Sequence, residues 1–274
     1  MRKLIDAETG EVFDNVRYIR TAESCEVYET IKSKKLFNRG NENFIFLTYK
    51  MLKEININKE IFKKEDITKV IYIASFMNYD CKLMLTERTP LSKIILKEKL
   101  GLSDYRFNLF YKKLIDNKVL TEKDGYIYFD NRIAFKGKSL GCTDSFTRIY
   151  KDNVQKIYES IDIREHKKLS ILFLMIPYLN LKYNIICKNP YETNKDLVKP
   201  LTLGEMAELF GIKERSFVTS IKYLKSIRDI DGNPLIAEIS ICPEISENVF
   251  VINPRFIYAG NNIEDVGAIC GLFN

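Results

Sequence analysis

Apolar residues recur at helical spacing over residues 66–116, in three successive segments. The first segment, 66–80, is apolar on nearly every face, which predicts a buried helix with Asp66 as its N-terminal cap. Ser92 then opens a shorter helix that ends at Gly101, where a left-handed backbone angle is commonly needed. Ser103 opens a third helix. Its predicted apolar face carries four residues at helical spacing: Phe107, Phe110, Tyr111 and Leu114.

A β-hairpin pattern follows the third helix directly. Strand-like residues 119–122 and 126–129 flank Lys123-Asp124-Gly125, which is a turn signal. Two short helices joined through a glycine turn are typical of a helix-turn-helix. Because a hairpin follows at once, the pattern predicts a winged helix.

The same order of elements occurs a second time. Residues 90–102 align without a gap to residues 200–212, so Gly101 matches Gly211, 110 positions later. Residues 128–137 match residues 251–260, and the apolar segment 65–80 mirrors 164–179. A second, longer hairpin is expected over 235–252, with its turn around 243–247.

The fold class that this pattern predicts is α+β, mainly helical, with two tandem winged-helix domains. The expected divisions are an N-terminal hairpin and basic helical extension (1–60), a first winged helix (61–140), a linker with a helix (141–162), a second winged helix (163–262) and a C-terminal tail (263–274). The insertion 181–199 is strand-like at Ile185–Cys187 before it becomes a loop, and it has no assigned role.

Composition restricts the possible locations and cofactors. No run of 18 apolar residues occurs, and acidic residues interrupt the N-terminus, so we expect a cytoplasmic protein with neither a membrane span nor a signal peptide. Six cysteines without a C-x-x-C pair and a single histidine predict reduced core thiols, no metal site and no cofactor. The net charge of +6 permits a polyanionic partner.

Sequence signatures of catalysis are missing as well. The chain has no phosphate-binding G-x-x-x-x-G-K-[ST] loop, no G-x-S-x-G and no paired histidines. His166 is expected to be exposed at a helix start, where a role as general base has no visible orienting partner. We therefore predict that the protein is not an enzyme.

Double-stranded DNA is the partner that a winged helix suggests, with the third helix of each unit in a major groove. The candidate contacts of the first unit are Asp104, Tyr105, Arg106, Asn108, Lys112 and Lys113. Those of the second unit are Lys213, Glu214, Arg215, Ser216, Thr219, Lys222 and Lys225. The alternative is that these residues form only the solvated face of an amphipathic helix. The second helix has four cations and one acid over 213–225, so it is the better candidate reader, whereas the first could instead pair two protomers in a homodimer.

Several motifs add a resemblance to known proteins. They are Arg164 through Ile176-Pro177-Tyr178-Leu179-Asn180, Tyr183-Asn184, Cys187-Lys188-Asn189-Pro190, Pro200-Leu201-Thr202, and Ile252-Asn253-Pro254-Arg255-Phe256-Ile257-Tyr258-Ala259-Gly260. In these residues the chain resembles replication and DNA-binding proteins of Gram-positive phages, plasmids and integrated elements. The closing Asn-Pro motif, with Ile5-Asp6, Glu8-Thr9-Gly10-Glu11 near the start, is similar to RepL-type plasmid replication proteins.

The resemblance implies a replication initiator of a mobile element that binds origin repeats and recruits host replication proteins. A transcriptional regulator or phage repressor of the same fold is the first alternative. A protein-docking adaptor of the replisome, without DNA readout, is the second.

Overall fold

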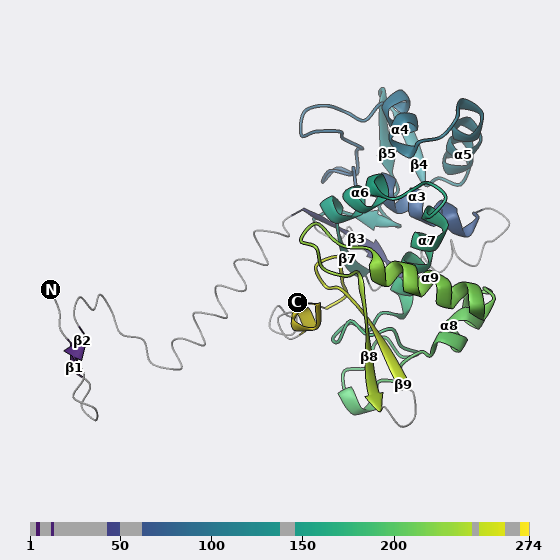
Figure 1. Ribbon diagram of the computed structural model, residues 1–274. Coiled ribbons are helices and arrows are strands. Elements are labelled where there is room, and N and C mark those ends of the chain that lie inside the picture. Colours follow the sequence, from purple (N-terminus) through teal and green to yellow (C-terminus); the bar gives the residue numbers. More distant parts are fainter. Residues whose placement is uncertain are drawn as a thin grey trace. The chain divides into compact units, whose positions relative to one another are not determined.

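A computed structural model describes residues 4–5, 12–13, 43–49, 62–137, 146–242, 247–260 and 269–273 (Figure 1). The chain divides into two compact units, Met1–Gly40 and Asn41–Asn274. In the first unit, strand β1 (Leu4–Ile5) pairs antiparallel with β2 (Val12–Phe13), which confirms the strands of the N-terminal hairpin. Its Thr-Gly turn and the basic stretch 17–39 lie outside the described residues.

The unit Asn41–Asn274 contains both sequence repeats, and we call residues 43–137 the first repeat and 146–260 the second. The first repeat consists of β3 (Phe44–Thr48), α3 (Lys64–Ala74), α4 (Lys93–Leu100), α5 (Asp104–Asp116), β4 (Leu120–Lys123), β5 (Tyr126–Phe129) and β6 (Ala134–Phe135). The second consists of β7 (Phe146–Tyr150), α6 (Lys151–Ser160), α7 (His166–Met175), α8 (Leu203–Leu209), α9 (Glu214–Ser226), β8 (Ile236–Cys242), β9 (Glu247–Ile252) and β10 (Ile257–Tyr258). Three 3₁₀ turns are η1 (Ile176–Tyr178), η2 (Lys195–Leu197) and η3 (Gly271–Phe273).

The helix pairs α4–α5 and α8–α9 form for the same local reasons. Ser92 caps α4 by accepting a hydrogen bond from the Ile95 N–H at 3.3 Å, and Thr202 caps α8 by accepting one from the Glu205 N–H at 3.2 Å. Gly101 and Gly211 follow with φ of 64° and 58°, a backbone conformation that glycine adopts without a steric penalty. α5 and α9 then each run for 13 residues and start 110 positions apart. The predicted repeat is present at the level of these elements.

The helix expected to start at Asp66 begins two residues earlier. α3 starts at Lys64, and Asp66 sits in its first turn, where its carboxylate accepts a hydrogen bond from the Lys63 N–H at 3.1 Å. Asp66 therefore caps the helix from inside it, as the acidic member of a capping box does.

Both predicted hairpins are present. β4 and β5 pair in register from Leu120↔Phe129 to Lys123↔Tyr126 around Asp124 and Gly125, whose φ angles are 52° and 75°. Two positive φ values are what a type I′ turn requires, and Asp-Gly tolerates them. β8 and β9 pair antiparallel with a shift between Ser240 and Cys242, and the connecting residues 243–246 lie outside the described part.

A four-stranded antiparallel sheet joins the two repeats, in the order β10-β7-β3-β6. Each repeat supplies one edge and one inner strand: β6 and β3 belong to the first, and β7 and β10 to the second. The inner strands pair from Phe44↔Tyr150 to Thr48↔Phe146. This sheet therefore relates the two repeats across its central strand pair.

The prediction of a mainly helical fold with two tandem winged-helix domains is wrong. The described residues form an α+β structure with four small antiparallel sheets, so the protein is not mainly helical, and two tandem winged-helix domains are not what the structure shows. Segments 44–48 and 146–150, predicted to belong to an extension and a linker, form the centre of the shared sheet. The pairing of β3 with β7 joins residues about 100 positions apart, so it cannot be predicted from the local sequence pattern.

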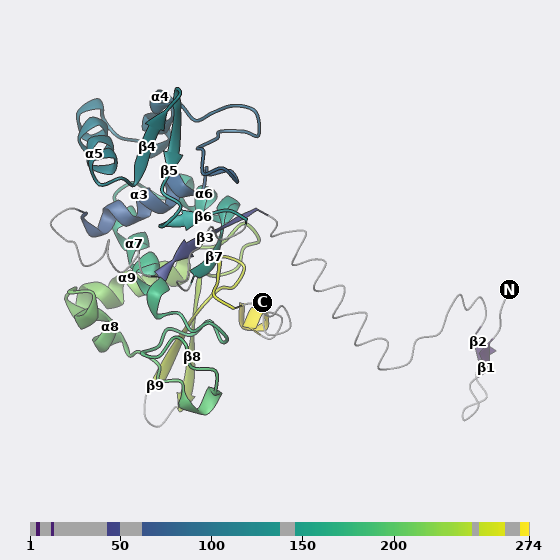
Figure 2. The same cartoon turned by 180° about the vertical axis from the view of Figure 1, so that it is seen from behind.

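One hydrophobic core runs through both repeats, from Ile45 to Ala259. α3 packs against α7, and Figures 1 and 2 show both helices between the end that carries α4 and α5 and the end that carries α8, β8 and β9. A smaller cluster places Ile269 and Phe273 against Val249 and Val251 of β9. Part of the predicted C-terminal tail is thus packed on the second hairpin.

The insertion 181–199 is anchored by the buried Asn184. Asn184 has a φ of 56°, and its Nδ2 donates to the carbonyl oxygens of Ile252 (2.7 Å) and Ile257 (2.8 Å). Its Oδ1 accepts a hydrogen bond from the Ala259 N–H at 3.1 Å. Gly260 follows, where a Cβ would lie 2.7 Å from the Leu181 carbonyl oxygen. The motifs that carry the family resemblance in this region therefore hold the second hairpin against the insertion.

Candidate nucleic-acid interface

Helix α9 divides cleanly into a buried and an exposed face. Phe217 is 0% exposed and packs inward with Ile221 and Leu224. On the opposite side, Arg215, Thr219 and Lys222 are exposed at spacings of four and three, which places them in one line along the helix. We call these three residues the α9 stripe.

Most of the predicted contacts of the second repeat are exposed. Lys213, Glu214, Arg215, Ser216, Thr219 and Lys222 all reach the surface. Lys225 is different, because it is half-buried and its Nζ lies 2.5 Å from Oε2 of Glu238 on β8. Lys225 therefore ties α9 to the second hairpin.

The equivalent helix of the first repeat exposes different chemistry. Five of the predicted contacts on α5 are exposed: Asp104, Tyr105, Arg106, Asn108 and Lys112. At the positions of the α9 stripe, however, α5 carries Tyr105 (79% exposed), Leu109 (60% exposed) and Lys112. Leu109 is not among the residues that the sequence pattern predicts as contacts. Arg215 corresponds to Tyr105, so the two predicted arginines, Arg106 and Arg215, are not equivalent.

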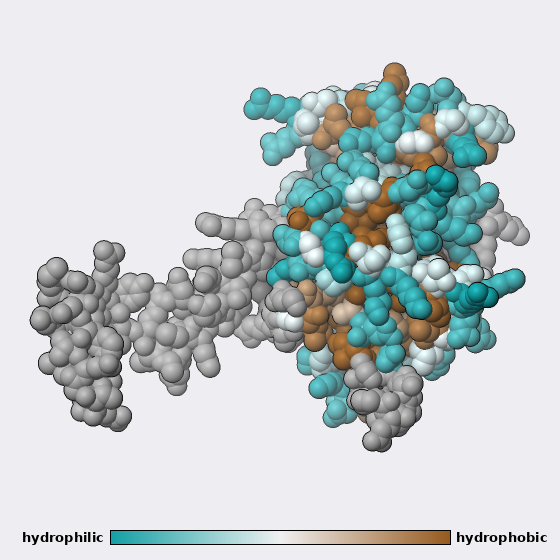
Figure 3. Space-filling view, in the orientation of Figure 1, coloured by the Kyte–Doolittle hydropathy of each residue, from teal (hydrophilic) through white to brown (hydrophobic). Residues whose placement is uncertain are grey.

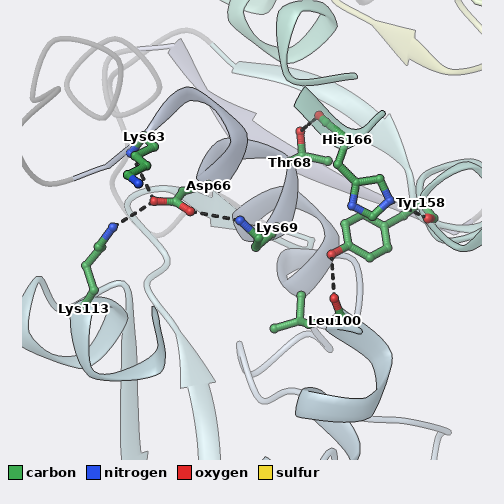
Figure 4. Close-up of polar contacts among 8 residues, drawn as sticks. All are labelled: Lys63, Asp66, Thr68, Lys69, Leu100, Lys113, Tyr158 and His166. Carbon is green, nitrogen blue, oxygen red and sulfur yellow. Dashed lines mark hydrogen bonds and ion pairs between the residues drawn. The ribbon is translucent and has the colours of Figure 1, made fainter. Parts of the chain in front are cut away.

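Lys113, a predicted DNA contact, is engaged inside the protein. Its Nζ lies 2.9 Å from Oδ2 of Asp66, while Nζ of Lys69 lies 3.0 Å from Oδ1 of the same carboxylate (Figure 4). Burial acts to raise the pKa of Asp66, but the hydrogen bonds and charges of Lys113 and Lys69 outweigh it and leave that pKa below its usual value. Asp66 therefore stays ionised and anchors α5 to the start of α3.

His166 is not exposed, contrary to the prediction. It is 5% exposed, its ring packs on Tyr158 with centroids 4.0 Å apart, and its Nε2 lies 3.0 Å from the Tyr158 carbonyl oxygen (Figure 4). Burial lowers the pKa of His166, which favours the neutral ring. The reason is that α7 packs against α3 from its first turn onward, where the His166 carbonyl accepts a hydrogen bond from the Thr68 hydroxyl at 3.1 Å. This position makes His166 a residue of the junction between repeats.

A cleft of about 520 Å³ opens beside the α9 stripe. Arg215 and Thr219 line it from α9, Lys213 from the preceding turn, and Lys167 from α7. Lys64 and Lys168 complete its basic lining. The lysines of α3 and α7 are not among the predicted contacts. The available signal was that basic residues occupy the first turns of these helices, where the helix dipole disfavours them.

The surface over this region is mixed but mainly polar. Figure 3 shows hydrophilic residues over much of the face that carries α9, with smaller hydrophobic groups between them. Hydrophobic groups also reach the surface at the end that carries α4 and α5, where Ile94 is 68% exposed.

The described thiols and carboxylates do not assemble into a metal site. Cys187 and Cys270 are buried and Cys81 is half-buried, all three as free thiols. Within the described ranges, no group of three or more histidine, cysteine or acidic residues could hold a metal ion. No helix in the described part of the chain has the length and apolar character to cross a membrane.

Comparisons with protein-family models, with curated proteins and with solved structures found no match. The resemblance to replication proteins consequently stays a prediction from the sequence.

Proposed function

We propose that the protein binds double-stranded DNA in a sequence-dependent manner, with α9 entering the major groove. The observation that carries this proposal is the α9 stripe. It presents Arg215, Thr219 and Lys222 in line, and the structure gives neither Arg215 nor Lys222 an ion-pair partner among the described residues. Exposed cations that no acid neutralises are available to a polyanion.

The chemistry of the stripe fits groove recognition. The major groove of B-DNA admits an α-helix, and an arginine can donate two hydrogen bonds to one guanine. Thr219 offers a hydroxyl that already donates to the Arg215 carbonyl at 2.8 Å and retains its acceptor lone pairs, with a methyl group that suits thymine. Lys222 lies one turn further, where a backbone phosphate is the natural partner.

The biological part of the proposal is replication initiation on a mobile element. It rests on the family resemblance, which implies origin repeats as the target and host replication proteins as partners. Direct repeats beside an AT-rich stretch in the flanking DNA would favour an origin, whereas a single operator near a promoter would favour a transcriptional regulator.

The direct test is selection of bound duplexes from random DNA by the full chain. We expect an enriched motif, and its symmetry reports how many copies of the protein bind. Recovery of no motif, together with no measurable affinity for duplex DNA at 50 mM salt, would contradict the proposal.

A second candidate concerns the first repeat alone. The exposed Tyr105 and Leu109 favour a protein contact over a DNA contact at α5, and a homodimer through this helix is one of the alternatives that the sequence allows. We expect Leu109→Lys to shift sedimentation toward the monomer, while Thr219→Lys at the matching position of α9 leaves self-association unchanged. A wild-type chain that is monomeric at all concentrations would remove this candidate.

A further inference from the structure

The cleft beside α9 gathers several positively charged side chains. Five cations line it, from three separate helix starts: Lys64, Lys167, Lys168, Lys213 and Arg215. No carboxylate is among the described residues that line it. Like charges gathered in one cleft repel one another, and a bound anion would relieve that repulsion.

The positions of these cations on their helices point the same way. Lys64 is the first residue of α3, Lys167 and Lys168 lie in the first turn of α7, and Arg215 lies in the first turn of α9. A helix N-terminus carries partial positive charge, so lysine and arginine are disfavoured there and anions are favoured. The first turn of α7 contains no acidic residue, whereas that of α3 contains Glu65 and Asp66 and that of α9 contains Glu214. Neither α7 nor α9 has a side-chain cap.

Three of the five cations of the cleft have no ion-pair partner among the described residues. Glu165 pairs with Lys168 at 2.5 Å and so removes one of the five charges. Glu214 faces α8, since its Oε1 lies 3.9 Å from the position that a Cβ on Gly204 would take. Lys167, Lys213 and Arg215 form no ion pair with any described residue.

The geometry of the walls suits a compact oxyanion. Nζ of Lys64 donates to the Gly211 carbonyl at 3.0 Å, which fixes the α8–α9 turn against the start of α3. Ser216 of α9 lines the same wall, and its hydroxyl has a donor that an oxyanion can use. Ser220 also lines the wall, but its hydroxyl donates to the Ser216 carbonyl at 2.8 Å. The cleft is continuous with the α9 stripe, because Arg215 and Thr219 belong to both.

We propose that this cleft binds a phosphate group, and that the group is a backbone phosphate of the DNA that α9 contacts. The assignment of the phosphate to DNA rests on the proposed function, whereas the proposal that the cleft binds a phosphate does not. A free phosphorylated compound would use the same cations, so the test separates the two sources.

The first arm measures the affinity of the full chain for an unrelated 25-bp duplex over a series of KCl concentrations. Each phosphate contact contributes about 0.9 to the slope of log K against log salt. Lys167→Gln is expected to reduce the slope by about 0.9 and the affinity by roughly five-fold at 0.15 M salt. Lys167→Arg should restore both. Lys195→Gln, which removes an exposed lysine of η2 outside the cleft, should leave the slope unchanged.

The second arm replaces DNA with inorganic tripolyphosphate and follows the melting temperature of the same proteins. If tripolyphosphate stabilises the wild type but not Lys167→Gln, and the DNA slope is unchanged, the ligand is a free phosphorylated compound and the DNA source is wrong. If neither arm responds to Lys167→Gln, the phosphate site itself is overturned. Should the wild type fail to bind DNA at all, the proposed function falls, and the second arm alone decides the cleft.

Discussion

Helices α5 and α9 have the same length, the same type of preceding glycine and the same buried positions, but they present different surfaces. Along the exposed line, α5 carries Tyr105, Leu109 and Lys112, and α9 carries Arg215, Thr219 and Lys222. The inward residues Phe107 and Phe217 are 2% and 0% exposed. The core thus constrains the buried faces of both helices in the same way, while their exposed residues are free to differ.

The two helices are also anchored differently. α5 is tied by Lys113 to the buried Asp66 of α3, whereas α9 is tied by Lys225 to the more exposed Glu238 of its own hairpin. A buried ion pair that loses one partner leaves an uncompensated charge, while a more exposed pair contributes little. α5 is therefore held by an ion pair to a buried acid of a core helix, whereas α9 is held by an ion pair to the hairpin of its own repeat.

The largest effect is expected at the shared buried position. Phe107→Ala and Phe217→Ala should each lower the free energy of unfolding by about 3–5 kcal/mol, because each leaves a cavity in a packed core. Urea unfolding measures both. The exposed change Thr219→Ala is the control, with an expected effect within about 0.5 kcal/mol. If only one phenylalanine mattered, the two helices would not be held equivalently.

The second-largest effect is expected at the ion pairs that anchor the two helices, Lys113–Asp66 for α5 and Lys225–Glu238 for α9. Asp66→Asn should lower the free energy of unfolding at pH 7 by about 1–3 kcal/mol, because it weakens hydrogen bonds to two charged lysines. Glu238→Gln, the control at the less buried anchor, should lower it by less than about 1 kcal/mol.

The effect of Asp66 depends on pH in a defined direction. The folded-state pKa of Asp66 is lowered, so its stabilisation is complete above the unfolded value, about 4, and is lost as pH falls through the lower folded value. The difference between wild type and Asp66→Asn should therefore shrink in acid. A difference that stays constant from pH 7 to pH 2 would mean that the carboxylate charge is not what anchors α5.

DNA readout sharpens the comparison further. Arg215→Ala should weaken binding to the selected site by about 1–3 kcal/mol and broaden base preference at one position. Tyr105→Ala, at the equivalent position of α5, should leave both unchanged. Competition binding with single-base variants of the site gives both quantities. Equal losses in the two variants would show that α5 reads DNA as well.

The smallest effect concerns the two matched lysines, Lys112 and Lys222. Lys222→Ala should reduce the salt slope by about 0.9 for any duplex, and Lys112→Ala should leave it unchanged. Affinity measured from 50 to 200 mM salt decides this. A slope that falls in both variants would place both helices on the phosphate backbone and end the distinction drawn between them.

Local chemistry was enough to predict much of the chain. Ser92, Gly101 and Gly211 mark helix ends, and Asp124-Gly125 marks a turn, through short-range hydrogen bonds and backbone angles that few residues permit. For the same reason the exposure of Arg215, Thr219 and Lys222 followed from helical spacing against Phe217. These features depend on neighbours within a few positions.

Contacts between distant segments were not predictable in this way. The pairing of β3 with β7 joins residues about 100 positions apart, and it replaced the expected tandem domains with repeats joined by one sheet. The burial of His166, the anchoring of Lys113 by Asp66, and the meeting of Lys64, Lys167 and Lys213 around one cleft arise only when α3, α7 and α9 pack together. The sequence determined the elements and their faces because those depend on local periodicity; the tertiary structure decided which faces meet, because that depends on packing across the whole core.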